Sequence, residues 1–273
     1  MATPTVFLSY NSTGINSIKA CWIRDLCKMT NTDFFSIQEH FKSTKNTDRY
    51  FKEQFSDYTT YVVPAIRDEN QETGRARGGI AQFSKKSIKV KTERIKTKNF
   101  RLQAQILVFP NTRLLWINSY LPNDPRTIAF NDNELLEVLQ EVEGILDSTD
   151  FDDCIWQGDM NWDMSRQSGF SKTMKQFMER LGLISVWEHY PIDYTHIHTD
   201  LSSTSSLDHF IVNERLLPLV LDAGPMHLGD NLSRHSPILL KLDLGSIPAR
   251  KLTKSVNLRK PACHKADQEY PNF

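Results

Sequence analysis

The sequence predicts an α/β protein in which two β-sheets pack on each other and helices cover their outer faces. Predicted strands outnumber predicted helices, and helices occur in both halves of the 273 residues. This order fits two packed sheets better than one purely parallel sheet. A hydrophobic share of 39% and a charged share of 24% are typical of an ordinary globular protein.

Hydrophobic periodicity defines the elements of the first half of the chain. Trp22 and Leu26 belong to a series at helical spacing that predicts a helix over residues 15–30. A shorter helix is expected at residues 46–55. Apolar, β-branched and aromatic runs predict strands at residues 5–10, 33–38, 58–63, 80–84, 87–97, 102–109 and 113–120.

The second half begins with a strongly amphipathic segment. Residues 132–147 place leucines on one face and acids on the other, which predicts a helix. Gly182 ends a second helix over residues 171–182. Strands are expected up to Trp156 and at residues 183–187, around 194–195, at 207–212 and at 238–242.

Residues 1–244 are interpreted as one domain. The pattern breaks after Leu244, where residues 245–273 combine three prolines and several basic residues with little apolar periodicity. We interpret this segment as a linker or a poorly ordered tail.

The bulk charge and the cysteines limit the possible partners. With 33 basic and 33 acidic residues the net charge is zero, so contact with nucleic acid has to come from local patches. The four cysteines form no Cys-x-x-Cys pair, which favours reduced thiols and an intracellular location. No apolar run reaches membrane-spanning length, so no membrane partner is expected.

The run from Cys154 to Asn161 is the most informative segment. An apolar strand ends at Gly158 and is followed by Asp159 and Asn161. Further polar residues stand at the ends of other predicted strands: Asn11, Glu39, Asp208 and His235. Taken alone, each could be a turn or a helix cap. Together they predict a metal-dependent phosphodiesterase site.

Each of these side chains has an expected task. Glu39, assisted by Asn11, suits Mg²⁺, with Mn²⁺ as an alternative, because hard cations prefer oxygen ligands. Asp159 would orient or deprotonate the attacking water, and Asn161 would donate to the phosphoryl oxygens.

His235 would bind the scissile phosphate or act as an acid or base. Asp208 would fix the tautomer of that imidazole and keep it charged. His196 and His198 could instead chelate a metal, but no complete ligand set accompanies them in the sequence.

These motifs resemble the endonuclease/exonuclease/phosphatase superfamily, and within it the apurinic-like endonuclease domain of LINE-type (non-LTR) retrotransposons. The likeness covers roughly residues 5–244. The motifs that carry it are Tyr10-Asn11-Ser12-Thr13-Gly14, Gln38-Glu39, Arg77-Gly78-Gly79, Ser119-Tyr120-Leu121-Pro122-Asn123, Gly158-Asp159-Met160-Asn161, Tyr194-Thr195, Ser206-Leu207-Asp208-His209 and Arg234-His235-Ser236-Pro237.

The resemblance implies a four-layer α/β/β/α sandwich and a DNA-nicking activity that leaves a 3′-hydroxyl and a 5′-phosphate. It implies that Tyr120 contacts phosphate and that Thr195 and Asn123 bind substrate. The segment from Lys260 to Ala266 looks like the connection to a reverse transcriptase, so the chain is similar to a detached part of a longer polyprotein.

Three arginines are candidates for phosphate contact. Arg75 and Arg77 lie in a glycine-rich loop, and Arg234 stands where the resembled family has an aspartate. Arginine can bind phosphate through two parallel hydrogen bonds. The same charge reversal is also compatible with an inactive copy. The lysine-rich residues 85–101 could follow a phosphate backbone or form a solvated edge.

The sequence thus predicts a monomeric, Mg²⁺-dependent DNA endonuclease without a small-molecule cofactor, which would be nuclear if it acts on chromosomal DNA. One alternative is a phosphatase of the same fold acting on phosphorylated small molecules or lipids. The other is a retroelement relic that binds nucleic acid but does not cut.

Overall fold

Two six-stranded sheets form the centre of the protein. The computed structural model describes residues 3–67, 75–127 and 133–248. The first sheet contains, in spatial order, β13 (Val220–Pro225), β14 (Ile238–Leu242), β1 (Thr5–Asn11), β2 (Phe34–Gln38), β4 (Ile80–Lys85) and β3 (Tyr58–Val63). The second contains β5 (Lys91–Ile95), β6 (Leu102–Val108), β7 (Arg113–Tyr120), β8 (Asp153–Asp159), β12 (Asp208–Asn213) and β9 (Leu183–Ser185).

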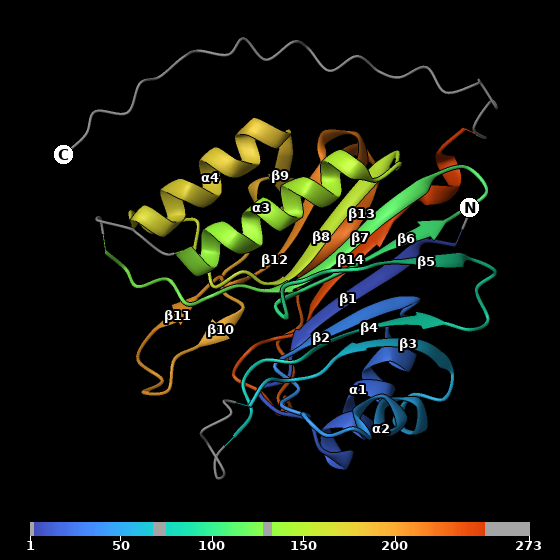
Figure 1. Ribbon diagram of the computed structural model, residues 1–273, viewed down its shortest axis with the longest axis horizontal. Coiled ribbons are helices and arrows are strands. Elements are labelled where there is room, and N and C mark those ends of the chain that lie inside the picture. The colour runs from blue at the N-terminus through green and yellow to red at the C-terminus, as the bar shows by residue number, and fades with distance from the viewer. Residues whose placement is uncertain (1–2, 68–74, 128–132, 249–273) are drawn as a thin grey trace.

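Helices cover the outer face of each sheet. The helices α1 (Ser17–Met29) and α2 (Thr47–Gln54) pack on the first sheet, and α3 (Asn133–Ser148) and α4 (Gly169–Leu181) pack on the second (Figure 1). A two-stranded hairpin, β10 (His196–Ile197) and β11 (Thr204–Ser205), stands apart from both sheets. The four-layer α/β/β/α sandwich is therefore confirmed.

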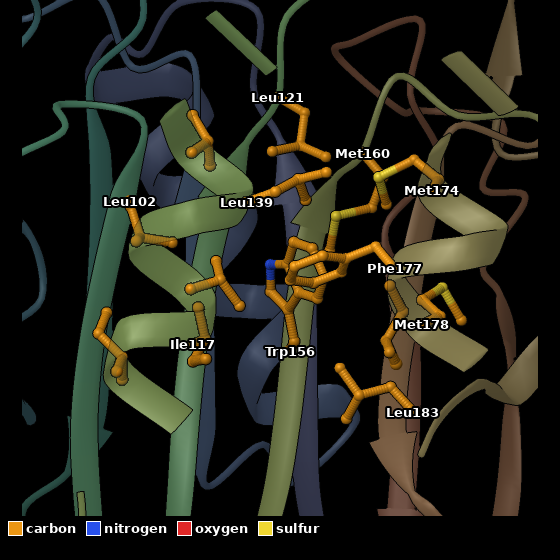
Figure 2. Packing of buried hydrophobic residues seen from close by; sticks show 14 of the residues in the cluster. Leu102, Ile117, Leu121, Leu139, Trp156, Met160, Met174, Phe177, Met178 and Leu183 are labelled. Atoms are coloured by element: carbon orange, nitrogen blue, oxygen red, sulfur yellow. The ribbon is translucent and has the colours of Figure 1, made fainter. Parts of the chain in front are cut away.

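Three apolar layers hold the sandwich together. Phe7 and Phe34 of the first sheet meet Trp116 of the second in the central layer. In the layer beneath α3 and α4, Trp156 lies between the two helices and packs edge-on against Phe177 at 6.0 Å (Figure 2). Burying aromatic side chains of this size stabilises the fold by about 2–3 kcal/mol each.

Strand pairing brings the predicted site residues to one edge of the sandwich. β1 and β2 run parallel, as do β7 and β8, and the hydrogen bond between Asn11 at the end of β1 and Asp159 at the end of β8 shows that both pairs end at the same edge. Within the second sheet, Asp159 is aligned with Tyr120 on one side and with Asp208 on the other. The predicted convergence of strand ends is present in the structure.

The close pairing of β7 and β8 requires a glycine at Gly158. Its φ is +139°, and a Cβ atom there would lie 2.0 Å from the carbonyl oxygen of Ser119. Residues other than glycine rarely adopt this backbone conformation. Gly158 therefore fixes the position of the next residue, Asp159, at the strand end.

Several predicted elements need correction. The strand expected at residues 183–187 ends at Ser185, and a 3₁₀ turn follows over Val186–Glu188 because the Glu188 side chain accepts the Ser185 backbone N–H at 3.2 Å. The strand expected around residues 194–195 is wrong, since β10 begins only at His196. The strand expected at residues 87–97 is confined to Lys91–Ile95.

The edge strand β13 is absent from the sequence-based prediction. It is mostly exposed or half-buried, contains a bulge between Val220 and Asp222, and ends at Pro225. These features remove the apolar alternation that marks a strand. At the C-terminal side, Ile247 packs into the central apolar layer, while residues 249–273 lie outside the described residues.

Cys21, Cys27 and Cys154 are free thiols, as predicted, and Cys263 lies outside the described residues. In the parts of the chain that the structure describes, the helices lack the length and apolarity needed to cross a bilayer.

Candidate active site

Part of the predicted set of side chains lines one cleft of about 290 Å³ at the ends of β2, β7 and β8. The β10–β11 hairpin contributes His196 and His198 to its wall. The walls include six residues that the sequence analysis selected: Glu39, Tyr120, Asn123, Asp159, Asn161 and His235.

Asp159 is buried at the end of β8 with both carboxylate oxygens engaged. Asn11 Nδ2 donates to Asp159 Oδ2 at 2.8 Å, and the backbone N–H of Asn161 donates to Oδ1 at 2.9 Å. Since Asn11 belongs to the first sheet and Asp159 to the second, the first of these bonds joins the two sheets beneath the cleft.

Asn161 adopts a left-handed backbone conformation with φ of +47°. This turn directs its N–H at Asp159. One N–H of the side-chain amide donates to the carbonyl oxygen of Leu121 at 2.8 Å, which fixes the amide plane. An amide has two donor hydrogens, so the second can serve a ligand in the cleft.

Asp208 and His235 form a buried pair opposite Asp159. His235 Nδ1 lies 2.8 Å from Asp208 Oδ2, which places the proton on Nδ1, and His235 Nε2 lies 4.0 Å from Asp159 Oδ2. The expected partnership of Asp208 with His235 is present.

Thr195 lies beneath this pair and is fully buried. Its hydroxyl accepts the backbone N–H groups of Leu207 at 2.9 Å and Asp208 at 3.0 Å. The backbone N–H of Ser236 donates to the Thr195 carbonyl oxygen at 2.7 Å. Thr195 therefore joins the segments that carry Asp208 and His235.

Burial and excess negative charge shift the pKa values of the central residues. Burial raises the pKa of Asp159 to about 7, with the carboxylates of Asp208 and Glu39 adding to the effect and His235 opposing it. Burial disfavours the charged form of His235, but Asp208 and Asp159 outweigh it and raise the pKa of His235 to about 9. At neutral pH His235 is a cation.

Glu39 follows β2 in a left-handed conformation with φ of +53°. Its carbonyl oxygen accepts the Gly14 N–H at 2.7 Å, and the next residue, His40, donates its N–H to Gly79 O at 3.1 Å. Residues other than glycine pay about 1–2 kcal/mol for this conformation. Burial, then the charges of Glu39 and Asp159, raise the pKa of the neighbouring Tyr120 hydroxyl.

The donor set fits a hard divalent cation. Ligand atoms of Asp159, Asp208 and His235 lie within 4.8 Å of one another, and Glu39 lines the same cleft. Asp208 Oδ1 is buried and has no hydrogen-bond partner among the described residues. The carboxylates of Glu39 and Asp159 line the cleft, and carboxylate oxygens are the ligands that a hard divalent cation prefers. Asn11 Oδ1 accepts the Thr13 N–H at 2.9 Å.

The three candidate arginines lie outside the centre of the cleft. Arg75 stacks over the Phe41 ring at 3.4 Å from its centroid. Arg77 is exposed and pairs through its backbone with Ile66. Arg234 is exposed, and its guanidinium donates to the Thr199 hydroxyl on the β10–β11 hairpin.

Two histidines of the hairpin line the cleft beside His235. The rings of His196 and His235 lie 4.4 Å apart, and those of His196 and His198 lie 4.9 Å apart. Among the described residues they join no group of three metal-ligating side chains. Their alternation directly after Thr195 was the available sequence signal for a cleft-lining role. Arg166 and Asp124 also line the cleft and were not selected from the sequence.

Comparison with solved structures gives several neighbours with the same fold. An AP endonuclease from Leishmania major superposes with a TM-score of 0.67 at 16% identity, covering 88% of this chain and 87% of that one. An AP endonuclease from Archaeoglobus fulgidus superposes with a TM-score of 0.65 at 17% identity, covering 88% and 100%. The endonuclease domain of TRAS1, a telomere-specific non-LTR retrotransposon, gives 0.63 at 12% identity, covering 88% and 98%.

A fourth neighbour, the Neisseria 3′ phosphatase NExo bound to product DNA hairpin, has a TM-score of 0.63 at 15% identity and covers 88% of this chain and 99% of that one. No protein-family model and no curated protein matches the sequence. The chain therefore has the fold of the AP endonucleases, and the resemblance noted from its motifs is confirmed at the level of the fold.

Proposed function

We propose that this chain is a Mg²⁺-dependent endonuclease that hydrolyses one phosphodiester bond of DNA, and that it derives from a non-LTR retrotransposon. The observation that carries the proposal is the buried Asp159, held between Asn11 and His235 in a cleft lined by Glu39. The fold shared with AP endonucleases and with the TRAS1 domain supports DNA as the substrate.

Glu39 would hold the cation, with Asn11 beside it. A bound Mg²⁺ or Mn²⁺ would offset the negative charge that gathers on the phosphoryl group. Asp159 orients the attacking water and accepts its proton. With a pKa of about 7 before any cation binds, it is a competent base near neutral pH. Asn161 donates its second amide N–H to a phosphoryl oxygen.

His235 binds the scissile phosphate as a cation. The Asp208 carboxylate accepts a hydrogen bond from His235 Nδ1–H, so that Nε2–H remains available to the substrate. Tyr120 stays protonated at physiological pH because its pKa is raised, and it donates its hydroxyl to a phosphate oxygen. Thr195, which the resemblance implied as a substrate ligand, instead positions Asp208, because the Thr195 hydroxyl accepts the backbone N–H of Asp208.

The remaining substrate contacts are assigned to the rim. Asn123 is exposed at the cleft and can reach a phosphate, and Arg75 and Arg77 are exposed on the first-sheet side. The Arg234 guanidinium donates to the Thr199 hydroxyl on the β10–β11 hairpin, which flanks His196 of the cleft wall. We assign Arg234 to binding a flanking phosphate.

The substrate class is tested by offering three substrates to the purified chain with Mg²⁺. We expect nicking of closed circular DNA with polymerase-extendable 3′-hydroxyl ends, and no phosphate release from inositol phosphates. Phosphate release from inositol phosphates or from a 3′-phosphorylated oligonucleotide without nicking would identify a phosphatase. A folded chain that binds DNA and cuts only as Arg234→Asp would be an impaired relic.

Two further proposals follow from a DNA substrate. Action on chromosomal DNA places the protein in the nucleus. The likeness of the segment from Lys260 to Ala266 to the connection in retrotransposons supports an ancestral fusion to a reverse transcriptase. The expected monomer is checked by light scattering of the purified chain.

A further inference from the structure

A cluster of buried amide and hydroxyl side chains joins the two sheets directly beneath the cleft. Gln38 Nε2 donates across the sheets to Asn118 Oδ1 at 2.7 Å. Gln157 Nε2 donates in the opposite direction to Ser36 Oγ at 2.7 Å and to Leu8 O at 3.2 Å. Gln38 Nε2 also contacts Ser36 Oγ at 2.9 Å, so Ser36 connects both glutamines.

Three of these residues precede site residues by one or two positions on the same strands. Gln38 directly precedes Glu39, Asn118 lies two residues before Tyr120, and Gln157 lies two before Asp159. Because side chains alternate along a strand, residues two apart share a face. Asn118 and Gln157 therefore lie one layer below Tyr120 and Asp159 on the same face of the second sheet, and Gln38 meets Asn118 from the first sheet.

Such a polar layer is unexpected between two sheets. Ser36, Gln38, Asn118 and Gln157 are all fully buried, and the Oε1 atoms of both glutamines have no partner among the described residues. Burying an amide costs free energy that its hydrogen bonds only partly recover. Apolar residues would stabilise this layer more, but apolar packing is non-directional. Directional bonds fix how one sheet lies over the other.

We propose that Ser36, Gln38, Asn118 and Gln157 are positioning residues that set the spacing between the catalytic groups of the two sheets. Glu39 is carried by the first sheet and Asp159 by the second, and the two carboxylates interact electrostatically. The bridge holds this spacing one layer below, where no substrate reaches. The inference rests on the proposed nuclease function.

The same inter-sheet space offers a matched control. Gln105 Nε2 of β6 donates to Gln82 Oε1 of β4 at 3.1 Å, and both residues are buried. This is the same kind of bond between the same two sheets. Gln82 is the cross-strand partner of Ser36 in the β2–β4 ladder, but among the described residues no side-chain hydrogen bond joins Gln82 or Gln105 to Ser36 or Gln157. Gln105→Met therefore reports the cost of losing an inter-sheet amide bond alone.

The test compares Ser36→Ala, Gln157→Met and Gln105→Met in the whole chain. For each, we would measure Mn²⁺ binding by calorimetry, kcat and KM for nicking, and the thermal midpoint. Ser36→Ala and Gln157→Met are expected to weaken Mn²⁺ binding and lower kcat by about tenfold each, with KM unchanged. In the double variant Ser36→Ala/Gln157→Met, the losses of Mn²⁺ affinity and kcat should be about as large as in either single variant, because each substitution breaks the same Ser36–Gln157 hydrogen bond.

Gln105→Met should lose a similar amount of thermal stability and keep wild-type Mn²⁺ affinity and kcat. The inference is overturned if all three variants lose stability alike while Mn²⁺ binding and kcat stay at the wild-type level. A wild-type chain that neither binds Mn²⁺ nor nicks DNA would refute the proposed function itself, which is a distinguishable result.

Discussion

Asn11 Nδ2 lies 2.8 Å from Asp159 Oδ2, so that a residue of the first sheet holds the carboxylate at the end of a strand in the second. Gly158 allows β7 and β8 to approach closely before this point, and His235 faces the same oxygen at 4.0 Å. The cleft is thus formed by residues of both sheets, and the distances between its side chains depend on how the two sheets are packed.

Removing the amide donor at Asn11 should reduce activity more than stability. Asn11→Leu leaves Asp159 Oδ2 without its buried donor, which raises the pKa of Asp159 further and frees the carboxylate to rotate. We expect kcat to fall by about 10–100-fold. Thr13→Ser keeps the Nδ2 donor and serves as the control. Equal nicking rates for the wild type and Asn11→Leu would show that this bond does not support catalysis.

The left-handed conformation of Glu39 should lower the free energy of unfolding relative to a chain with glycine at this position. Glu39→Ala and Glu39→Gly both remove the carboxylate and should abolish nicking. Glu39→Gly should be the more stable by roughly 0.5–1 kcal/mol, because glycine adopts positive φ freely but loses more chain entropy on folding. Lys45, which has negative φ, is the control, since Lys45→Gly should be less stable than Lys45→Ala. Urea unfolding gives the free energy of unfolding of all four variants.

The pKa of His235 should depend on Asp208. In metal-free protein, Asp208→Asn removes the carboxylate that raises the pKa of His235 to about 9, and we expect this pKa to fall by roughly 1–3 units in an NMR titration. Because the folded pKa exceeds the unfolded one, the associated stability is present below about pH 6.5 and is lost as the pH rises through about 9.

That loss should become smaller in Asp208→Asn, where Asp159 still raises the pKa of His235, while Asp193→Asn, which removes the partner of His227, should leave the pKa of His235 unchanged. A His235 resonance that titrates identically in the wild type and in Asp208→Asn would contradict the assigned pairing.

Gly158→Ala should destabilise the fold severely. The new Cβ would lie 2.0 Å from the Ser119 carbonyl oxygen, so β7 and β8 would have to separate. We expect a loss of at least about 3 kcal/mol in the free energy of unfolding. Gly144→Ala is the control: the site in α3 is open, and alanine should stabilise the helix by roughly 0.5–1 kcal/mol. A Gly158→Ala protein as stable as the wild type would refute this account of the strand pairing.

Much of the fold could be predicted because its strands and helices are strongly periodic. Phe34–Gln38 is buried throughout and α3 has a continuous apolar face, so both were evident from the sequence. The exposed edge strand Val220–Pro225 was missed because a bulge and a proline interrupt its pattern. Local periodicity identifies elements that face a core, and it loses its signal at sheet edges.

The residues of the site could likewise be predicted only in part. Asp159 and Glu39 could be selected because each follows a buried strand and carries a recognisable motif. The buried position of Thr195 and the ring contact between His196 and His235 depend on contacts with segments farther along the chain, and local periodicity does not show which segments meet. The central claim nevertheless concerns a residue that the sequence identified.

That claim is that Asp159 carries the hydrolytic reaction, and the most direct test is the nicking rate of Asp159→Asn on supercoiled plasmid with Mg²⁺. The substitution keeps the shape of the side chain and removes its base and its charge. With the fold verified by circular dichroism, we predict a loss of roughly 10²–10⁴-fold relative to the wild type, and no nicking by the wild type in EDTA. Nicking by Asp159→Asn at the wild-type rate would contradict the account.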